Sequence, residues 1–167
     1  MSGLSTGVGL SVANAPFATI LDTTTQSIAV ANTPQVVTFN TTLISDGISV
    51  VTSGGKASRI TVSQAGKYLI IFSAVANNSA GTDGGMSFWL KKNGTNIDNS
   101  STYVTTVVAS LYICASCSFI AEATSSTDYF ELWTQGAYTT QSVAALAASG
   151  GVPLSPSVIL TINKISD

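Results

Sequence analysis

Two acidic side chains, Asp128 and Glu131, stand close enough along the chain to suggest paired-carboxylate chemistry. Glycoside hydrolases use two carboxyl groups about 5–9 Å apart to flank the bond that they cleave. The segment from 128 to 133 alternates apolar and polar residues like a strand, and residues i and i+3 of a strand point to opposite faces. We therefore expect Asp128 to lie in a turn and Glu131 to point outward, without converging on a substrate.

Histidine is absent from the whole sequence. The usual general base, the usual nitrogen ligand of zinc and any Ser-His-Asp triad are therefore missing. Cys114 and Cys117 form a CxxC motif, but no βαβ pattern surrounds it, as a redox site would require. Residues i and i+3 of a strand lie about 10 Å apart, too far for a disulfide. We expect two buried free thiols that act as small apolar residues.

The glycine-rich segment 79–85 lacks the lysine and the following helix of a phosphate-binding loop. Asp83 in this segment could at most contribute one ligand to calcium. The sequence thus predicts no enzyme, no cofactor and no metal site. Six Lys and Arg residues are scattered along the chain, too few for a phosphate-binding stripe, so we expect no nucleic-acid partner. No apolar run approaches 18 residues and no signal peptide is visible, which predicts no membrane span and synthesis in a cytoplasm.

Charged residues make up only 8% of the 167 residues, and the net charge is -2. Ordinary soluble domains carry roughly 25% charged residues. Serine and threonine supply much of the polar surface instead, and uncharged hydroxyls suit a buried interface better than lysine or glutamate does. We therefore expect a surface that other subunits cover, although Ser/Thr-rich extracellular β proteins without assembly remain an alternative.

Short β-branched and aromatic runs separated by turn residues predict an all-β domain over residues 17–167, preceded by a flexible N-terminal arm over 1–16. The run Lys67–Phe72 is apolar at both parities, which predicts a central strand buried on both faces. Asn93-Gly94 predicts a type I′ hairpin turn. The expected strands are 17–23, 26–31, 35–40, 47–52, 58–63, 67–76, 86–92, 96–109, 111–121, 128–135 and 157–165.

The segment from 139 to 156 is rich in Ala, Val and Leu although it joins two strands. Such a loop either packs over the end of its own sandwich or contacts a neighbouring molecule. Its candidates for partner contact are Val143, Leu146, Val152 and Leu154.

The order of six segments resembles the C1q/TNF-like jelly-roll family, and most closely its versions in bacteriophage structural proteins. These segments are QVVTFN (35–40), a glycine-bounded strand near Gly47, SRITVSQAGKYLIIFSA (58–74), FWLKKNGTNI (88–97), DYFELW (128–133) and PSVILTINKI (156–165). The resemblance covers about 17–167 and implies a jelly-roll β-sandwich of about ten strands that forms a homotrimer. It makes five residues candidates for either the core or the three-fold axis: Tyr68, Ile70, Phe72, Phe130 and Leu132. The collagen-like stalk of animal C1q proteins is absent, which argues against an animal signalling role.

These observations predict a non-enzymatic virion structural protein, assembled in the host cytoplasm as a trimeric capsid decoration or cement subunit on a bacteriophage head. Its partners would be two further copies and the major capsid protein or another virion protein. The alternative is a trimeric receptor-binding module at a fibre tip that recognises a host surface glycan. Its sugar would stack in a groove between subunits on Trp89, Tyr103, Trp133 or Tyr138. A glycan hydrolase is a weaker third reading.

Overall fold

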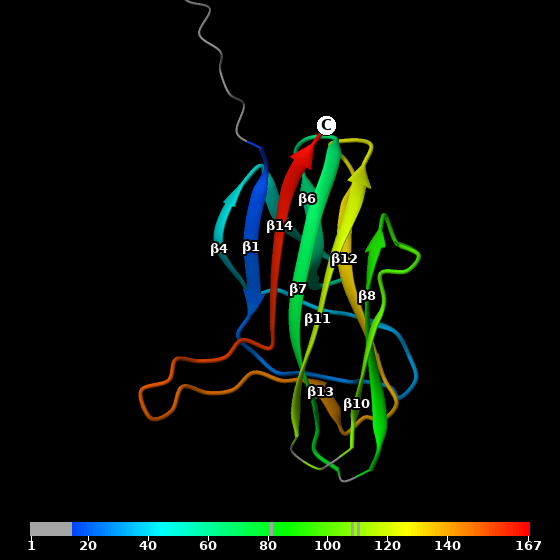
Figure 1. Cartoon of the computed structure of the whole chain (residues 1–167), viewed down its shortest axis with the longest axis vertical. Coiled ribbons are helices and arrows are strands. Elements are labelled where there is room, and N and C mark those ends of the chain that lie inside the picture. The colour runs from blue at the N-terminus through cyan, green and yellow to red at the C-terminus, as the bar shows by residue number, and fades with distance from the viewer. Residues whose placement is uncertain (1–14, 81, 108, 110) are drawn as a thin grey trace, which may run out of the picture.

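A computed structural model of the chain describes residues 15–80, 82–107, 109 and 111–167. Over these residues the protein is a sandwich of two antiparallel sheets with seven strands each (Figure 1). The described residues contain no helix, so none is available there to cross a lipid bilayer. The prediction of an all-β sandwich is thereby confirmed, with fourteen strands over these residues in place of about ten.

One sheet, here called the front sheet because it faces the viewer in Figure 1, has the order β2-β13-β7-β14-β1-β4, and β11 also pairs with β7. Its strands are β1 (Phe17–Asp22), β2 (Gln26–Ser27), β4 (Thr41–Asp46), β7 (Gly66–Asn78), β11 (Tyr112–Ala123), β13 (Gln141–Val143) and β14 (Val158–Ser166). β7 and β11 pair along their whole common length, from Gly66 opposite Ala123 to Asn77 opposite Tyr112.

The second sheet, here called the back sheet, has the order β10-β8-β12-β6-β5. β3 pairs with β12 and β9 pairs with β8. Its strands are β3 (Gln35–Val36), β5 (Ile48–Ser53), β6 (Lys56–Val62), β8 (Gly84–Lys92), β9 (Thr95–Asn96), β10 (Thr102–Thr106) and β12 (Tyr129–Gly136). The Asn-Gly hairpin between β8 and β9 is as predicted, with φ of 51° at Asn93 and 80° at Gly94.

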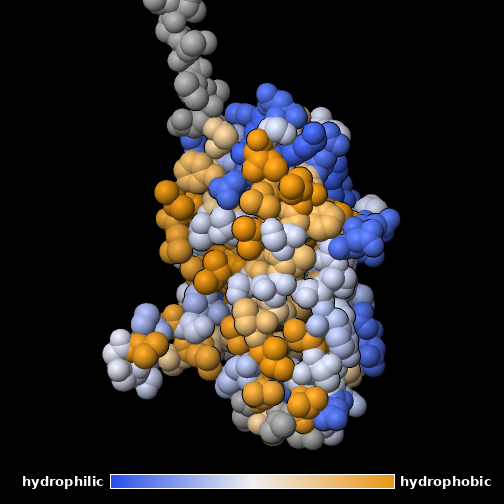
Figure 2. Space-filling view, viewed as in Figure 1, coloured by the Kyte–Doolittle hydropathy of each residue, from blue (hydrophilic) through white to orange (hydrophobic). Residues whose placement is uncertain are grey.

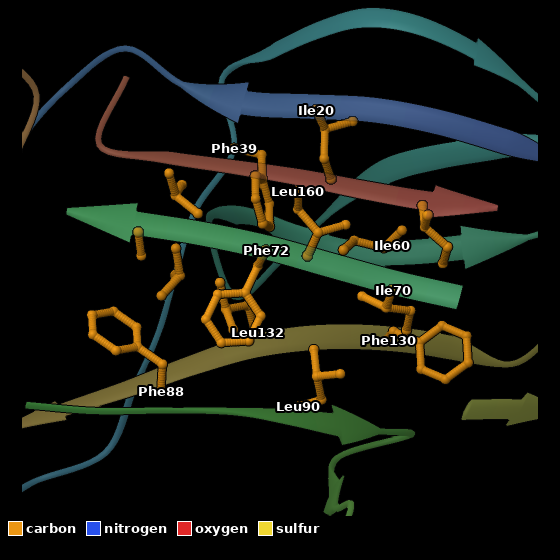
Figure 3. Close-up of a cluster of buried hydrophobic side chains, with 14 of the residues drawn as sticks. Ile20, Phe39, Ile60, Ile70, Phe72, Phe88, Leu90, Phe130, Leu132 and Leu160 are labelled. Atoms are coloured by element: carbon orange, nitrogen blue, oxygen red, sulfur yellow. The ribbon is translucent and has the colours of Figure 1, made fainter. Parts of the chain in front are cut away.

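The core fills the space between the sheets with large side chains from both inner faces (Figure 3). The Tyr68 ring of β7 lies 6.2 Å from the Phe130 ring of β12, and the Phe72 ring lies 6.3 Å from the Phe88 ring of β8. The five candidates for core or axis all belong to this core and expose no more than 1% of their surface: Tyr68, Ile70, Phe72, Phe130 and Leu132. Burial of each such side chain stabilises the fold by about 1.5–3 kcal/mol.

The prediction that Lys67–Phe72 is buried on both faces is wrong. Tyr68, Ile70 and Phe72 point into the core, whereas Ile71 between them is 42% exposed. The reason is topological: β7 is central within its sheet, but among the described residues no further layer covers the outer face of that sheet.

Other boundaries also differ from the prediction. The segment 96–109 is not one strand, because β9 ends at Asn96 and β10 begins at Thr102. β4 and β13 were not predicted as strands. The N-terminal arm over 1–16 lies outside the described residues except for its last two. Of these, Pro16 accepts a 2.8 Å hydrogen bond from the backbone N–H of Lys164.

Candidate functional site

The outer face of the front sheet carries a cluster of aliphatic side chains, here called the apolar face: Ile44, Leu69, Ile71, Ile120 and Ile159. All are exposed except Leu69, which is half-buried. Figure 2, in the same view as Figure 1, shows apolar residues over β1, β14, β7 and β11. Register places these side chains side by side, with Ile120 opposite Leu69 and Ile159 opposite Ser73, two residues beyond Ile71 on β7. Ile71, Ile159 and Ile120 are 42%, 38% and 56% exposed. Contiguous exposed apolar surface marks an interaction site.

Charge is confined to the margins of this face. Lys67 lies opposite Glu122 at one end, and Asp46 lies on the edge strand β4. Between them, β7 from Tyr68, β11 as far as Ala121 and β14 as far as Asn163 contain no charged residue. A partner can therefore cover the middle of the face without desolvating an unpaired charge, which is the costly step in most interfaces.

A two-stranded arm over residues 144–157 projects from the sandwich beside this face, at the lower left of Figure 1. Its strands are joined by bridges between Leu146 and Ser155 and between Ser149 and Val152. The tip carries Gly150 and Gly151, both at positive φ. Val152 and Leu154 are 67% and 39% exposed. Because this uncharged, apolar arm projects from the sandwich, the rest of its own chain buries little of its apolar surface.

The predicted partner-contact residues therefore fall into two groups, three on the arm and one in the core. Val152 and Leu154 are exposed on the arm, and Leu146 is half-buried at its base. The prediction for Val143 is wrong, because Val143 lies in β13, pairs with Ala76 of β7 and is fully buried in the core.

The two cysteines lie on opposite sides of β11. Cys117 lies on the inner side and packs against the core, but it is only partly buried, so its predicted burial holds in part. Cys114 is exposed, so its predicted burial is wrong. Its sulfur lies 3.1 Å from the hydroxyl of Ser73, on the same outer surface as the apolar face. Cys114 is exposed because residues three apart on β11 point to opposite faces. The face that carries Cys114 is the outer one, which no other described element covers.

The outer face of the back sheet is built differently, from aromatic rings interleaved with charges; we call these residues the aromatic-charged ladder. The Nζ of Lys91 lies 3.7 Å from the centre of the Trp133 ring, and the guanidinium of Arg59 lies 4.3 Å from that of Tyr129. Trp133 also lies 6.5 Å from Trp89. Cation–aromatic contacts of this kind contribute about 0.5–1 kcal/mol each at exposed sites.

Glu131 belongs to this ladder and does not form a catalytic pair. Its carboxylate lies 3.5 Å from the Nε of Arg59 and accepts a 3.1 Å hydrogen bond from the indole N–H of Trp133. It points to the outer face, as expected, but these neighbours leave it only 6% exposed. The carboxylate is thus fully engaged in holding the ladder.

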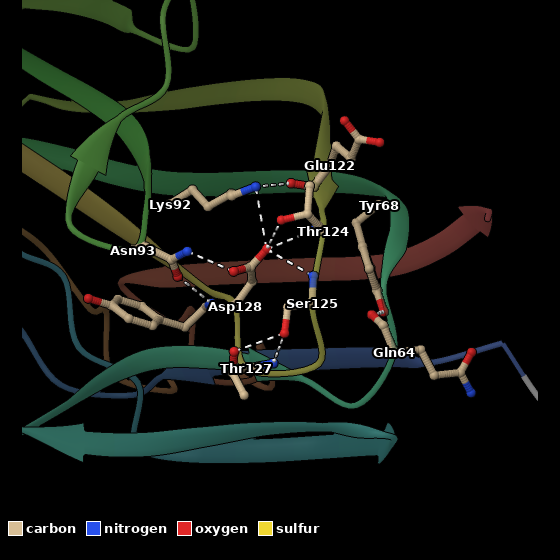
Figure 4. A network of polar contacts seen from close by, with 10 residues as sticks. Gln64, Tyr68, Lys92, Asn93, Glu122, Thr124, Ser125, Thr127 and Asp128 are labelled. Atoms are coloured by element: carbon tan, nitrogen blue, oxygen red, sulfur yellow. Dashed lines mark hydrogen bonds and ion pairs between the residues drawn. The ribbon is translucent and has the colours of Figure 1, made fainter.

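Asp128 lies at the end of the sheet, in a separate network that fixes the turn before β12 (Figure 4). It accepts hydrogen bonds from the side chain of Asn93 at 2.7 Å and from the backbone N–H of Thr124 at 2.7 Å. Lys92 lies 3.4 Å away. The Asn93 bond, helped by Thr124 and Lys92, lowers the pKa of Asp128 to about 2. Asp128 is therefore a structural anion, as its predicted turn position implies.

No metal site is evident in the described part of the chain, where no three His, Cys, Asp or Glu side chains gather. Asp83, the one residue considered for calcium, is exposed in the turn before β8.

Sequence reasoning missed the residues of the apolar face. The sequence did contain an indication of them. In the strand predicted to be apolar on both faces, Leu69 and Ile71 alternate with the core residues and therefore point to the other face. Burial was expected on that face, with other subunits as the cover of an apolar outer surface. Within the described residues no layer of the chain itself covers it.

Comparison with known proteins supports the fold and leaves the function open. No protein-family model matches the chain, and no curated protein matches it. Among solved structures, those of murine APRIL at pH 5.0 and at pH 8.5 are similar, each with a TM-score of 0.54 and 11% sequence identity. Each alignment covers 91% of this chain and 100% of that chain. The chain therefore has a TNF-like jelly-roll fold.

Proposed function

We propose that this protein is a non-enzymatic structural subunit that functions as a homotrimer, with the apolar face of the front sheet buried between copies. The observation that carries the proposal is the uncharged aliphatic surface formed by Leu69, Ile71, Ile120 and Ile159, on a face that no other described part of the chain covers. Three-fold symmetry is the arrangement that the C1q/TNF-like resemblance implies. Obligate interfaces bury roughly 2,000 Å² or more and are more apolar than other surface.

The arm over residues 144–157 extends this surface. Because Val152 and Leu154 are 67% and 39% exposed on an arm that projects from the sandwich (Figure 1), contact with a second molecule is the way for them to leave water. Burial of apolar area contributes about 25 cal/mol per Å². In this arrangement the arm contacts either a neighbouring copy or the larger structure on which the trimer sits.

The setting that we propose is a virus particle, with the trimer as a capsid decoration or cement subunit on a bacteriophage head. Its support is the family resemblance together with a charge-poor chain that suits permanent assembly. The alternative setting is a fibre tip that recognises a host glycan, which the open polar face of the back sheet favours. Electron microscopy of particles with labelled protein separates the two: many copies over the shell favour decoration, and a few copies at the tail favour the tip.

Size-exclusion chromatography with light scattering tests the homotrimer directly. The purified chain should elute with three times its 17.0 kDa mass at micromolar concentration. A well-folded monomer under those conditions would contradict the proposal, and a dimer would contradict the three-fold arrangement while retaining the interface.

A further inference from the structure

A shallow groove crosses the outer face of the back sheet beyond the aromatic-charged ladder. One hollow of about 350 Å³ is lined by Trp89, by Ser87 and Gln135, and by the segment from Asn96 to Asn99 with Ser101. A second hollow of about 200 Å³ is lined by Tyr103 and Asn32, and again by Ser87 and Gln135. The two hollows share Ser87 and Gln135 and therefore adjoin, and together they are here called the back-face groove.

The loop that forms one wall of this groove is rigidly held. Ile97 packs against the core, and its backbone N–H donates to Leu90 at 3.0 Å. Ser100 is fully buried; its hydroxyl donates to the carbonyl of Ile97 at 2.7 Å and accepts from the N–H of Leu90 at 3.0 Å. Asn99 adopts a φ of 61°. Because this wall is already ordered, less conformational entropy is lost when a ligand binds.

Polar side chains along the groove remain available to a ligand. Asp98, Asn99 and Ser101 are exposed, and Ser87 and Gln135 are half-buried. Within the described residues no side-chain hydrogen bond engages any of these five groups, whereas Glu131 of the ladder beside them accepts a hydrogen bond from Trp133. They offer hydroxyl, amide and carboxylate groups, which together both donate and accept hydrogen bonds.

Two aromatic rings, those of Trp89 and Tyr103, lie along the same groove. The indole N–H of Trp89 donates to Asn96 at 2.9 Å, which orients its ring in the first hollow. Tyr103 of β10 lies against Gly85 of β8, where a Cβ atom would overlap its ring. Tyr103 is nevertheless 64% exposed, so much of its ring is open to solvent. Trp133, in contrast, is covered by Lys91.

We propose that the back-face groove binds a neutral oligosaccharide. The apolar C–H faces of pyranose rings pack on aromatic rings such as Trp89 and Tyr103, and sugar hydroxyls both donate to and accept from amide and carboxylate groups. Asp98 is the one charged residue among the described residues that line the groove. A lone carboxylate repels sulfated or sialylated chains, so the ligand is uncharged. The groove lies on one subunit, and its binding does not depend on self-association.

The test is a titration of the full chain with neutral oligosaccharides (maltohexaose, cellohexaose, laminarihexaose, mannohexaose and chitohexaose), with sialyllactose and a heparin oligosaccharide for comparison. Saturation-transfer NMR and tryptophan fluorescence report binding. We expect at least one neutral probe to bind, and Trp89→Ala or Tyr103→Ala to weaken that binding about tenfold or more. Tyr112→Ala on the front sheet is the matched control and should bind normally.

A second pair of variants protects the test against misfolding. Gln135→Ala and Asn99→Gly change accessible groups, and each should weaken binding severalfold without a change in thermal unfolding. Binding that survives Trp89→Ala and Tyr103→Ala, a preference for the anionic probes, or no binding of any neutral probe would overturn the inference. A chain made monomeric by Ile71→Asp should still bind, so that failure of the homotrimer and failure of the groove give different results.

Discussion

Both outer faces of this sandwich carry apolar side chains, but the two faces present them to solvent in different ways. On the back sheet, Trp133 and Tyr129 lie beneath Lys91 and Arg59, so each ring has a charged side chain between itself and water. On the front sheet, Ile71 and Ile120 have no such cover. A face of the first kind is complete in one chain, whereas a face of the second kind needs a partner. The contrast predicts that substitutions on the two faces have separable effects.

The largest effect should come from Phe72→Asp. Phe72 points into the core beside Phe88, and a carboxylate there would have neither water nor a partner. Loss of the ring alone costs about 3–5 kcal/mol, so we expect the chain to be unfolded or insoluble. Circular dichroism of the refolded chain measures this. A folded, soluble variant would contradict the assignment of the inner face.

Ile71→Asp changes the next residue and should leave the fold intact. Its side chain is 42% exposed on the apolar face, so the new charge meets water in the monomer and a neighbouring subunit in the trimer. We expect association to weaken about 100-fold, or roughly 3 kcal/mol, with thermal unfolding of the monomer little changed. Gln135→Asp on the back sheet is the control and should leave the oligomer mass unchanged. Equal effects of both substitutions would refute the contrast between the faces.

Removal of the arm should have a smaller effect on the same equilibrium. If two glycines replace Leu146–Ser155, the exposed apolar contacts are lost while the core is untouched. We expect association to weaken about tenfold at unchanged monomer stability. Sedimentation velocity measures the association, and thermal unfolding measures the stability of the monomer. Val152→Ser with Leu154→Ser, in an arm of full length, separates loss of apolar contact from loss of length.

Acid should destabilise the back sheet through Asp128. Its pKa is about 2 in the folded chain, against an ordinary value of 3.8. A carboxyl group with a lowered pKa stabilises the fold above its unfolded pKa, and that contribution is lost as the pH falls from about 4 to about 2. The shift corresponds to about 2 kcal/mol. Urea unfolding of wild type and Asp128→Asn across this range should show a pH-dependent difference that disappears at the acid end.

Glu131→Gln should have the smallest effect, about 1 kcal/mol on the free energy of unfolding. It weakens the ion pair with Arg59, which is partly screened by solvent, while an amide oxygen can still accept from Trp133. Chemical denaturation with tryptophan emission as the probe reports it. Any polysaccharide hydrolysis by the wild-type chain that this substitution abolished would contradict a purely structural role.

Local patterns in the sequence predicted much of the fold. Alternation over 128–133 identified which residues share a face of β12, and Asn93-Gly94 predicted the tight turn at the end of β8. Alternation cannot decide whether a face is covered, because cover comes from elements remote in the chain. Thus Ile70 and Ile71 are indistinguishable in the sequence, yet one is buried and the other exposed. The burial of Glu131 likewise depends on Arg59, which lies in β6 and is remote in the sequence.

Missed strands have similar causes. β4, with the sequence TTLISD, contains few aromatic or β-branched apolar residues and forms because it pairs with β1 at the edge of the sheet. β13 is only three residues long and forms between β2 and β7. Val143 and Leu146 are both apolar residues of one apparent loop, and only the pairing of Val143 with Ala76 separates a core residue from an arm residue.

The exposed position of Cys114 makes the outer face of the front sheet sensitive to oxidation. Its thiol is bare on the surface that we expect assembly to cover, beside the hydroxyl of Ser73. Oxidation of cysteine beyond the sulfenic state adds a permanent negative charge. Such a charge would lie on the outer face of the front sheet, opposite Val75 of β7. It would therefore oppose the association of subunits through that face.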